Sequence, residues 1–117
     1  MRYLMITIMM LLAWGVSAPK VNAEVSSADI ERGKSLTFGR KKGNCLACHV
    51  IADGTLPGNS GPPLVAMKTR FPDREKLKEQ IYDARMRNAN TIMPPFGAHE
   101  ILTAEELERV VDYIYSL

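Results

Sequence analysis

The sequence predicts an all-α fold built from a few short helices. No stretch of any length alternates apolar and polar residues as a half-buried strand would, and no internal repeat is present. Near the C-terminus, Thr103-Ala104-Glu105-Glu106 has the form of a capping box. Apolar residues then recur at helical spacing, with Tyr113 beside them: Leu107, Val110, Ile114 and Leu117. This apolar face predicts a helical partner that buries it.

Residues 26–38 predict a first helix that packs on the last one. A Ser or Asp can cap its start, and Asp29 and Glu31 lie in the first turns, where the helix dipole favours acidic side chains. Gly33 lies on the apolar face and lowers helix propensity by about 1 kcal/mol relative to Ala. We therefore expect Gly33 to permit close approach to a side chain such as Tyr113. A tolerated surface glycine is the alternative.

A third helix is predicted to begin at Pro72-Asp73. Its inner face carries Leu77, Ile81 and Ala84. Its charged outer face, residues 73–79, is interpreted as solvated. The earlier segment 53–63 is rich in Gly and Pro, so regular structure is not expected there.

Cys45-Leu46-Ala47-Cys48-His49 is the most specific motif in the chain. The spacing Cys-x-x-Cys-His is the attachment signature of c-type haem, in which two thiols add across the vinyl groups and the imidazole reaches the iron. We therefore predict one covalent haem c, tethered by Cys45 and Cys48, with His49 as the proximal ligand. Such a cofactor would also supply apolar mass to the core of a small domain.

Three other uses of this motif are weaker. A structural zinc site needs four ligands, whereas the chain has two Cys and two His, of which Cys48 and His49 are adjacent. A thioredoxin-like dithiol would follow a strand, whereas this motif follows the polar segment 40–44. A disulfide between Cys45 and Cys48 suits an exported protein but leaves His49 unexplained.

Residues 1–23 are predicted to be a secretory signal peptide, with residues 24–117 as one mature domain. Arg2 supplies a positive charge, residues 4–16 are largely apolar, and Val21-Asn22-Ala23 is a small-residue cleavage site. The apolar run is shorter than the roughly 20 residues of a membrane span, and an uncleaved N-terminal anchor is the alternative. No later stretch is apolar enough to cross a bilayer. We expect a periplasmic protein, since bacterial haem attachment occurs outside the cytoplasm.

The charge of the mature chain is predicted to be near neutral. Arg2 and Lys20 would leave with the signal, so that 13 basic residues would face 13 acidic ones. This balance argues against nucleic acid as a partner. Arg40, Lys41 and Lys42 form a basic cluster beside the motif, which either steers an acidic partner or is simply a solvated turn.

An electron-transfer haem with six ligands needs a second side chain on its far face, and a thioether there raises its potential. Met67 lies in an apolar patch typical of core filling, and Met86 at the end of the third helix is interpreted as helix packing. Met93 precedes Pro94-Pro95, which stop a helix and stiffen the backbone. We predict Met93 as the distal ligand. His99 is the main alternative, followed by Met67, Met86 or an open iron.

These segments together resemble the class I cytochromes c. The matching pieces span nearly all of residues 24–117: the Gly33-bearing first helix, the haem motif, Gly61-Pro62-Pro63-Leu64, Met93-Pro94-Pro95-Phe96-Gly97 and the aromatic-bearing last helix. The resemblance implies a cytochrome c domain in which Pro62 offers its carbonyl to His49 Nδ1–H and Pro62 and Leu64 lie at the haem. A simple turn is the alternative for residues 61–63. The gap between Phe38 and Cys45 is longer than in the mitochondrial type, which leaves the packing of Phe38 open.

More narrowly, residues 39–49, 57–64, 93–97 and 102–103 resemble the SoxX family, the small monohaem subunits of SoxAX cytochrome complexes of sulfur oxidation. The resemblance implies a periplasmic heterodimer. Its larger SoxA-type subunit joins thiosulfate oxidatively to a cysteine of the SoxYZ carrier, and this chain relays the electrons to a downstream cytochrome. This chain would hold no catalytic residues, since haem attachment consumes both cysteines, although the complex would be an L-cysteine S-thiosulfotransferase.

Two other function classes stay open on the sequence alone. A free-standing periplasmic cytochrome c shuttle would use the same residues without a permanent partner. An enzyme acting through an open iron site would need a vacant or displaceable sixth ligand position.

Overall fold

A computed structural model describes residues 24–117, and the predicted signal segment 1–23 lies outside the described residues. Within that range the structure contains helices and loops and no strand, which confirms the all-α prediction. Its elements are α1 (Ser27–Phe38), η1 (Cys45–Ala47), α2 (Met67–Arg70), α3 (Arg74–Tyr82), η2 (Ala84–Met86) and α4 (Ala104–Tyr115). No helix in the described part of the chain is both long and apolar enough to cross a membrane.

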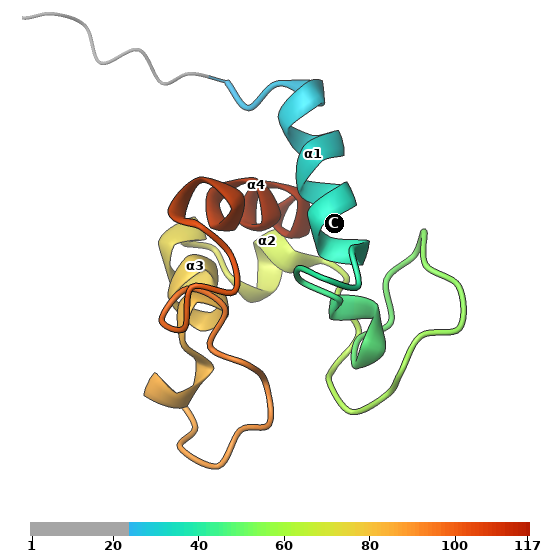
Figure 1. Cartoon of the computed structure of the whole chain (residues 1–117). Helices are drawn as coiled ribbons and strands as arrows, with labels where there is room; N and C mark the ends of the chain where they lie inside the picture. Colours follow the sequence, from blue (N-terminus) through green and yellow to red (C-terminus); the bar gives the residue numbers. More distant parts are fainter. Residues whose placement is uncertain (1–23) are drawn as a thin grey trace, which may run out of the picture.

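Helices α1 and α4 cross in direct contact with each other (Figure 1). A Cβ atom on Gly33 would overlap the carbonyl oxygen of Arg109 and would lie 2.9 Å from Tyr113 Cβ. The prediction that Gly33 serves close packing against Tyr113 is therefore confirmed. Phe38 packs at the same crossing, with its ring centroid 6.2 Å from that of Tyr113. An ion pair of 3.2 Å between Arg109 Nε and Asp29 Oδ1 fastens the start of α1.

Helix α4 forms the centre of the core, and its apolar face is buried as predicted. Its first turn has the capping box, in which Glu106 N–H donates to Thr103 Oγ1 at 3.2 Å and Thr103 N–H donates to Glu106 Oε2 at 3.0 Å. The apolar stripe is buried, and Leu117 packs against it: Leu107, Val110 and Ile114 are each at most 3% exposed. Two faces of α4 therefore contact α1 and α3.

Helix α3 begins as predicted and ends earlier. Asp73 caps it by accepting from Glu75 N–H at 2.9 Å, and Leu77 and Ile81 are buried. The helix ends at Tyr82 because Asp83 is extended and its carboxylate caps the next turn, accepting from Arg85 N–H at 3.1 Å. Ala84 is buried in η2 instead.

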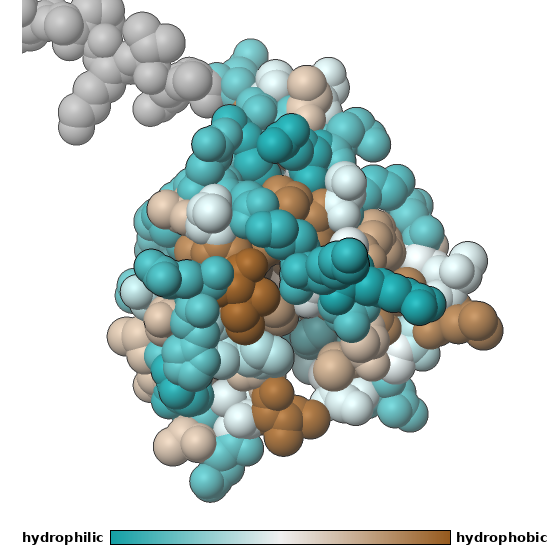
Figure 2. Space-filling view, in the orientation of Figure 1, coloured by the Kyte–Doolittle hydropathy of each residue, from teal (hydrophilic) through white to brown (hydrophobic). Residues whose placement is uncertain are grey.

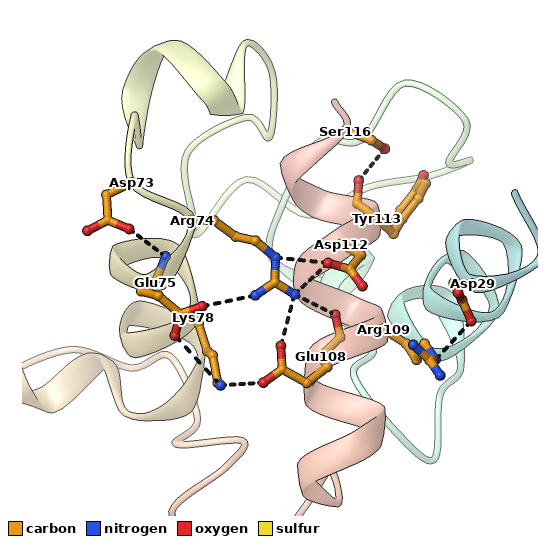
Figure 3. Close-up of polar contacts among 10 residues, drawn as sticks. All are labelled: Asp29, Asp73, Arg74, Glu75, Lys78, Glu108, Arg109, Asp112, Tyr113 and Ser116. Carbon is orange, nitrogen blue, oxygen red and sulfur yellow. Dashed lines mark hydrogen bonds and ion pairs between the residues drawn. The ribbon is translucent and has the colours of Figure 1, made fainter. Parts of the chain in front are cut away.

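One prediction about this region is wrong and another holds only in part. Met86 does not pack as part of a helix, because it lies at the end of η2 and its side chain is 73% exposed. The charged face of α3 is only partly solvated. Lys76 and Glu79 pair in solvent, whereas Arg74 and Lys78 contact α4 (Figure 3).

Arg74 connects α3 to a nearly buried carboxylate on α4. Its Nε donates to Asp112 Oδ1 at 2.9 Å, and its Nη2 donates to Glu108 Oε2 at 2.9 Å (Figure 3). Asp112 is only 9% exposed, so Arg74 supplies the counter-charge and the hydrogen bonds that a carboxylate at this depth needs. Burial alone would raise the pKa of Glu108, but Lys78 and Arg74 hold that pKa below its ordinary value.

Replacing Gly33 by Ala tests the crossing of α1 and α4. The added methyl group meets backbone, which cannot rotate away, so we expect a loss of about 2 kcal/mol in folding free energy. This loss corresponds to a fall on the order of 10 °C in Tm, measured by circular dichroism. Ser35→Ala, at an exposed position of the same helix, is the control and should leave Tm unchanged or slightly higher. Equal stability of the Gly33→Ala protein would contradict the close contact.

Replacing Arg74 by Ala tests the ionic connection between α3 and α4. The substitution strands the Asp112 carboxylate, so we expect a cost of about 2–3 kcal/mol at pH 7, against less than about 1 kcal/mol for Lys78→Ala. The lowered pKa of Glu108 means that its stabilising interaction is present above pH 4.5 and is lost as the pH falls further. The difference between variant and parent should therefore narrow below pH 4. Urea titrations at pH 7 and below pH 4 measure the free energy of unfolding of parent and variants. Equal losses for Arg74→Ala and Lys78→Ala at pH 7 would refute this role of Arg74.

Candidate functional site

A cavity of about 520 Å³ opens between the loop after η1 and the loop after η2, with α3 and α4 behind it. The space-filling view shows a hollow on this face, with apolar groups on part of its rim and hydrophilic groups above it (Figure 2). All six site residues predicted from the sequence line the cavity: Cys45, Cys48, His49, Pro62, Leu64 and Met93. Its volume is within the range of cofactor sites.

The haem motif is held on one tight turn. Asn44 precedes it in a left-handed conformation, with φ of 47°, and Gly43 before that is buried with its N–H donating to Leu36 O at 3.1 Å. Cys48 and His49 N–H groups both donate to Cys45 O, at 3.2 and 2.9 Å. Both thiols and the imidazole are therefore carried by a single turn that follows closely after α1.

The imidazole of His49 is held by a backbone carbonyl. Its Nδ1 lies 2.7 Å from Pro62 O, and because a carbonyl oxygen only accepts, Nδ1 carries the proton in this contact. In the neutral imidazole this tautomer leaves the lone pair on Nε2. Gly61 permits this arrangement, since a Cβ there would overlap the ring and lie 2.7 Å from Nδ1. Gly61 N–H also donates to Cys48 O at 2.8 Å. His49 is thus oriented as a neutral metal ligand would be.

The cysteine environment does not suit dithiol redox chemistry. Burial raises the pKa of Cys45 to about 11, whereas redox dithiols need a lowered thiol pKa. Among residues 24–117, no three His, Cys, Asp or Glu side chains converge to hold a metal ion.

Met93 lies on the cavity wall nearer α3. Its N–H donates to Thr91 Oγ1 at 3.2 Å, and Gln80 Nε2 on α3 lies 4.0 Å from its sulfur. The loop that carries it is fastened to the end of α3, where Gly97 N–H donates to Tyr82 O at 3.0 Å. Met93 is half-buried and lines the same cavity as the imidazole.

The other candidate ligands are placed differently. Met67 also lines the cavity, but it is 1% exposed and belongs to the core around α4, as its sequence context predicted. His99 and Met86 are outside the residues that line the cavity, and both are exposed.

The basic cluster divides between two environments. Lys42 Nζ pairs with Glu106 Oε1 of α4 at 2.8 Å, so it holds the turn before the motif and is not simply solvated. Arg40 and Lys41 are exposed, and Arg40 also lines the cavity.

The residues present fit haem c. Two thiols and an imidazole with a free Nε2 lie on one turn, and a thioether lies in the same cavity. Apolar side chains from α3 and α4 form the back wall, Leu77, Ile81, Val110 and Ile114 among them. The cationic residues Arg40, Lys42 and Arg70 line the cavity and no acidic residue among 24–117 does, which suits a group with two carboxylates.

Two polar contacts of the site were missed on the sequence alone. Gln80 lies three positions after Leu77 and therefore on the same face of α3. A polar residue on this apolar face could have indicated that its side chain contacts the site. Arg70 donates to Pro63 O at 2.7 Å, and nothing in the spacing of the chain pointed to that contact.

Comparisons with known proteins give a family and a structural neighbour. The family model described as cytochrome C oxidase, cbb3-type, subunit III matches residues 28–114. An uncharacterized lipoprotein of Aquifex aeolicus (strain VF5) is 36% identical over 78 residues, which are 66% of this chain but only 38% of that protein. A chain of the crystal structure of SoxXA from P. pantotrophus superposes with a TM-score of 0.66 at 28% identity, covering 74% of this chain and 79% of that one.

Proposed function

The chain belongs to the family of cytochrome C oxidase, cbb3-type, subunit III, and we propose that within it this protein is the small monohaem subunit of a SoxXA-type complex. It is a c-type cytochrome, an electron carrier whose Cys-x-x-Cys pair implies covalent haem c. The structural likeness to SoxXA and the flanking segments of the motif support the narrower assignment.

Each residue of the cavity has a distinct role in this proposal. Cys45 and Cys48 tether the haem, His49 binds it on the proximal side and Met93 on the distal side. Haem c, when bound, supplies a one-electron couple. The observation that most supports the role of His49 is the bond of its Nδ1 to Pro62 O, because it leaves Nε2 as the ligand atom and raises its basicity.

The chain itself performs no sulfur chemistry in this proposal. Once both cysteines hold haem, no thiol nucleophile is left, so thiosulfate conjugation to the SoxYZ carrier belongs to a larger SoxA-type partner. This subunit takes electrons from the partner one at a time and passes them to a downstream cytochrome.

We also propose that the protein is exported and works in the periplasm. Residues 1–23 act as a cleaved signal, and residues 24–117 form the cytochrome c domain. The name of the Aquifex relative, a lipoprotein, supports export, as does the need of haem attachment for an extracytoplasmic compartment.

A free-standing electron shuttle is the second candidate. The family match is compatible with it, because the family that matches residues 28–114 is not described as part of a sulfur-oxidising complex.

Substitution of Met93 tests the distal ligand. Met93→Ala should abolish the methionine-to-iron charge-transfer band and lower the reduction potential, because the thioether stabilises reduced iron. Visible spectroscopy and redox titration measure both. Met67→Ala should keep the band but cost about 2–5 kcal/mol in stability, as expected for a buried side chain.

Met86→Ala is the matched control for this test. Its side chain is 73% exposed, so the band, the potential and the stability, within about 0.5 kcal/mol, should stay those of the parent. A Met93→Ala protein with an unchanged spectrum and potential would refute the ligand assignment.

Purification from the native host, grown on thiosulfate, tests the complex. We expect the chain to elute with a larger haem-containing subunit, detected by haem staining and mass spectrometry. Elution alone, with one covalent haem in its mass, would favour the free shuttle. A mature chain without any added haem mass would refute both.

A further inference from the structure

The Gly61–Leu64 segment that carries the Pro62 carbonyl has few hydrogen bonds of its own. Pro62 and Pro63 have no N–H, and their rings fix φ, so ψ is the soft torsion left at each. The orientation of the Pro62 carbonyl toward His49 therefore depends on what holds the next peptide unit, between Pro63 and Leu64.

That peptide unit is held at both edges. Leu64 N–H donates to Val50 O at 2.9 Å, and Pro63 O accepts from Arg70 Nη1 at 2.7 Å. With both edges fixed and φ of Pro63 locked, only ψ of Pro63 separates this plane from the one that carries the Pro62 carbonyl.

Arg70 itself extends from a fixed base. It ends α2, whose first residue Met67 is 1% exposed and donates its N–H to Leu117 O at 3.1 Å. The guanidinium also lies 3.5 Å from Met67 Sδ. Arg70 is an exposed residue, so its replacement leaves the core around α4 intact.

From this geometry we propose that Arg70 is a positioning residue for the proximal imidazole: by fixing the Pro63–Leu64 peptide it keeps the Pro62 carbonyl on His49 Nδ1–H. The inference rests on the proposed function, since it takes His49 as the proximal ligand. Arg70 of α2 would thus orient the His49 imidazole without contacting it.

The test measures the hydrogen exchange of His49 Nδ1–H by NMR in the haem-bearing protein. Arg70→Met, which removes the donors but keeps an unbranched side chain, should exchange about tenfold faster, the factor that one net hydrogen bond represents. Arg70→Lys keeps a donor and the charge, so it should recover most of the parent's protection. The Tm of Arg70→Met should fall by no more than about 10 °C, the shift expected from the loss of one net hydrogen bond in a domain of this size, and that of Arg70→Lys by less.

Arg40→Met is the matched control. Arg40 lines the same cavity but has no side-chain hydrogen bond or ion pair within residues 24–117, so its loss removes a positive charge without touching the loop. Its Nδ1–H exchange should equal that of the parent. The reduction potential of Arg70→Met should lie above that of Arg40→Met, because a weaker Pro62 bond makes the imidazole less basic and favours reduced iron.

Exchange in Arg70→Met within twofold of the parent would overturn the inference and leave the proposed function intact. The inference also fails if Arg40→Met accelerates exchange equally, since a charge effect would then account for the change. A parent protein lacking covalent haem would overturn the proposed function itself, and this outcome is read from its mass before any variant is made.

Discussion

The contact of α1 with the backbone of α4 is the constraint on which the rest of the structure depends. Gly33 lets α1 contact the backbone of α4 directly. The chain that leaves α1 therefore reaches Cys45 at the cavity, whose back wall includes Val110 and Ile114 of α4. Lys42 secures the same turn by pairing with Glu106, the residue that completes the cap of α4. One helix thus fixes both the back of the cavity and the approach to its tethering cysteines.

The opposite wall depends on a different kind of interaction. Helix α3 is fastened to α4 by apolar packing of Leu77 and Ile81 and by Arg74 on the nearly buried Asp112. It then carries Gln80 toward Met93 and holds the loop of that methionine through Tyr82 O. The imidazole of His49 is therefore held by a backbone carbonyl, whereas the helix behind Met93 is held to α4 by apolar side chains and ion pairs.

Much of the architecture could be predicted because it follows local rules. The capping box at Thr103, the stripe through Ile114 and the packing reason for Gly33 depend on spacing within one helix, and the structure has all three. The exposed Met86 and the role of Arg74 could not be predicted in this way. One depends on where a neighbouring Asp stops a helix, and the other on a carboxylate 38 positions away.

The same limit applies to the cavity. Motif spacing predicted Cys45, Cys48 and His49, the following prolines predicted Met93, and the family resemblance implied Pro62 and Leu64. The contact of Arg70 with Pro63 O links a side chain to a backbone oxygen and leaves no pattern in the chain. A backbone acceptor is the same in every residue type, so only the folded chain shows which carbonyl a given arginine reaches.

The large sequence separation between the residues that contact each other near α1 and α4 also affects how the domain folds. Small helical proteins fold fast when their contacts are local, whereas here the turn before the motif and the start of α4 meet across 64 positions, in the pair of Lys42 with Glu106. The chain between them must close a large loop before either wall gains its partner. Haem held at Cys45 and Cys48, early in that loop, would give the collapsing chain an apolar centre against which the distant helices could pack.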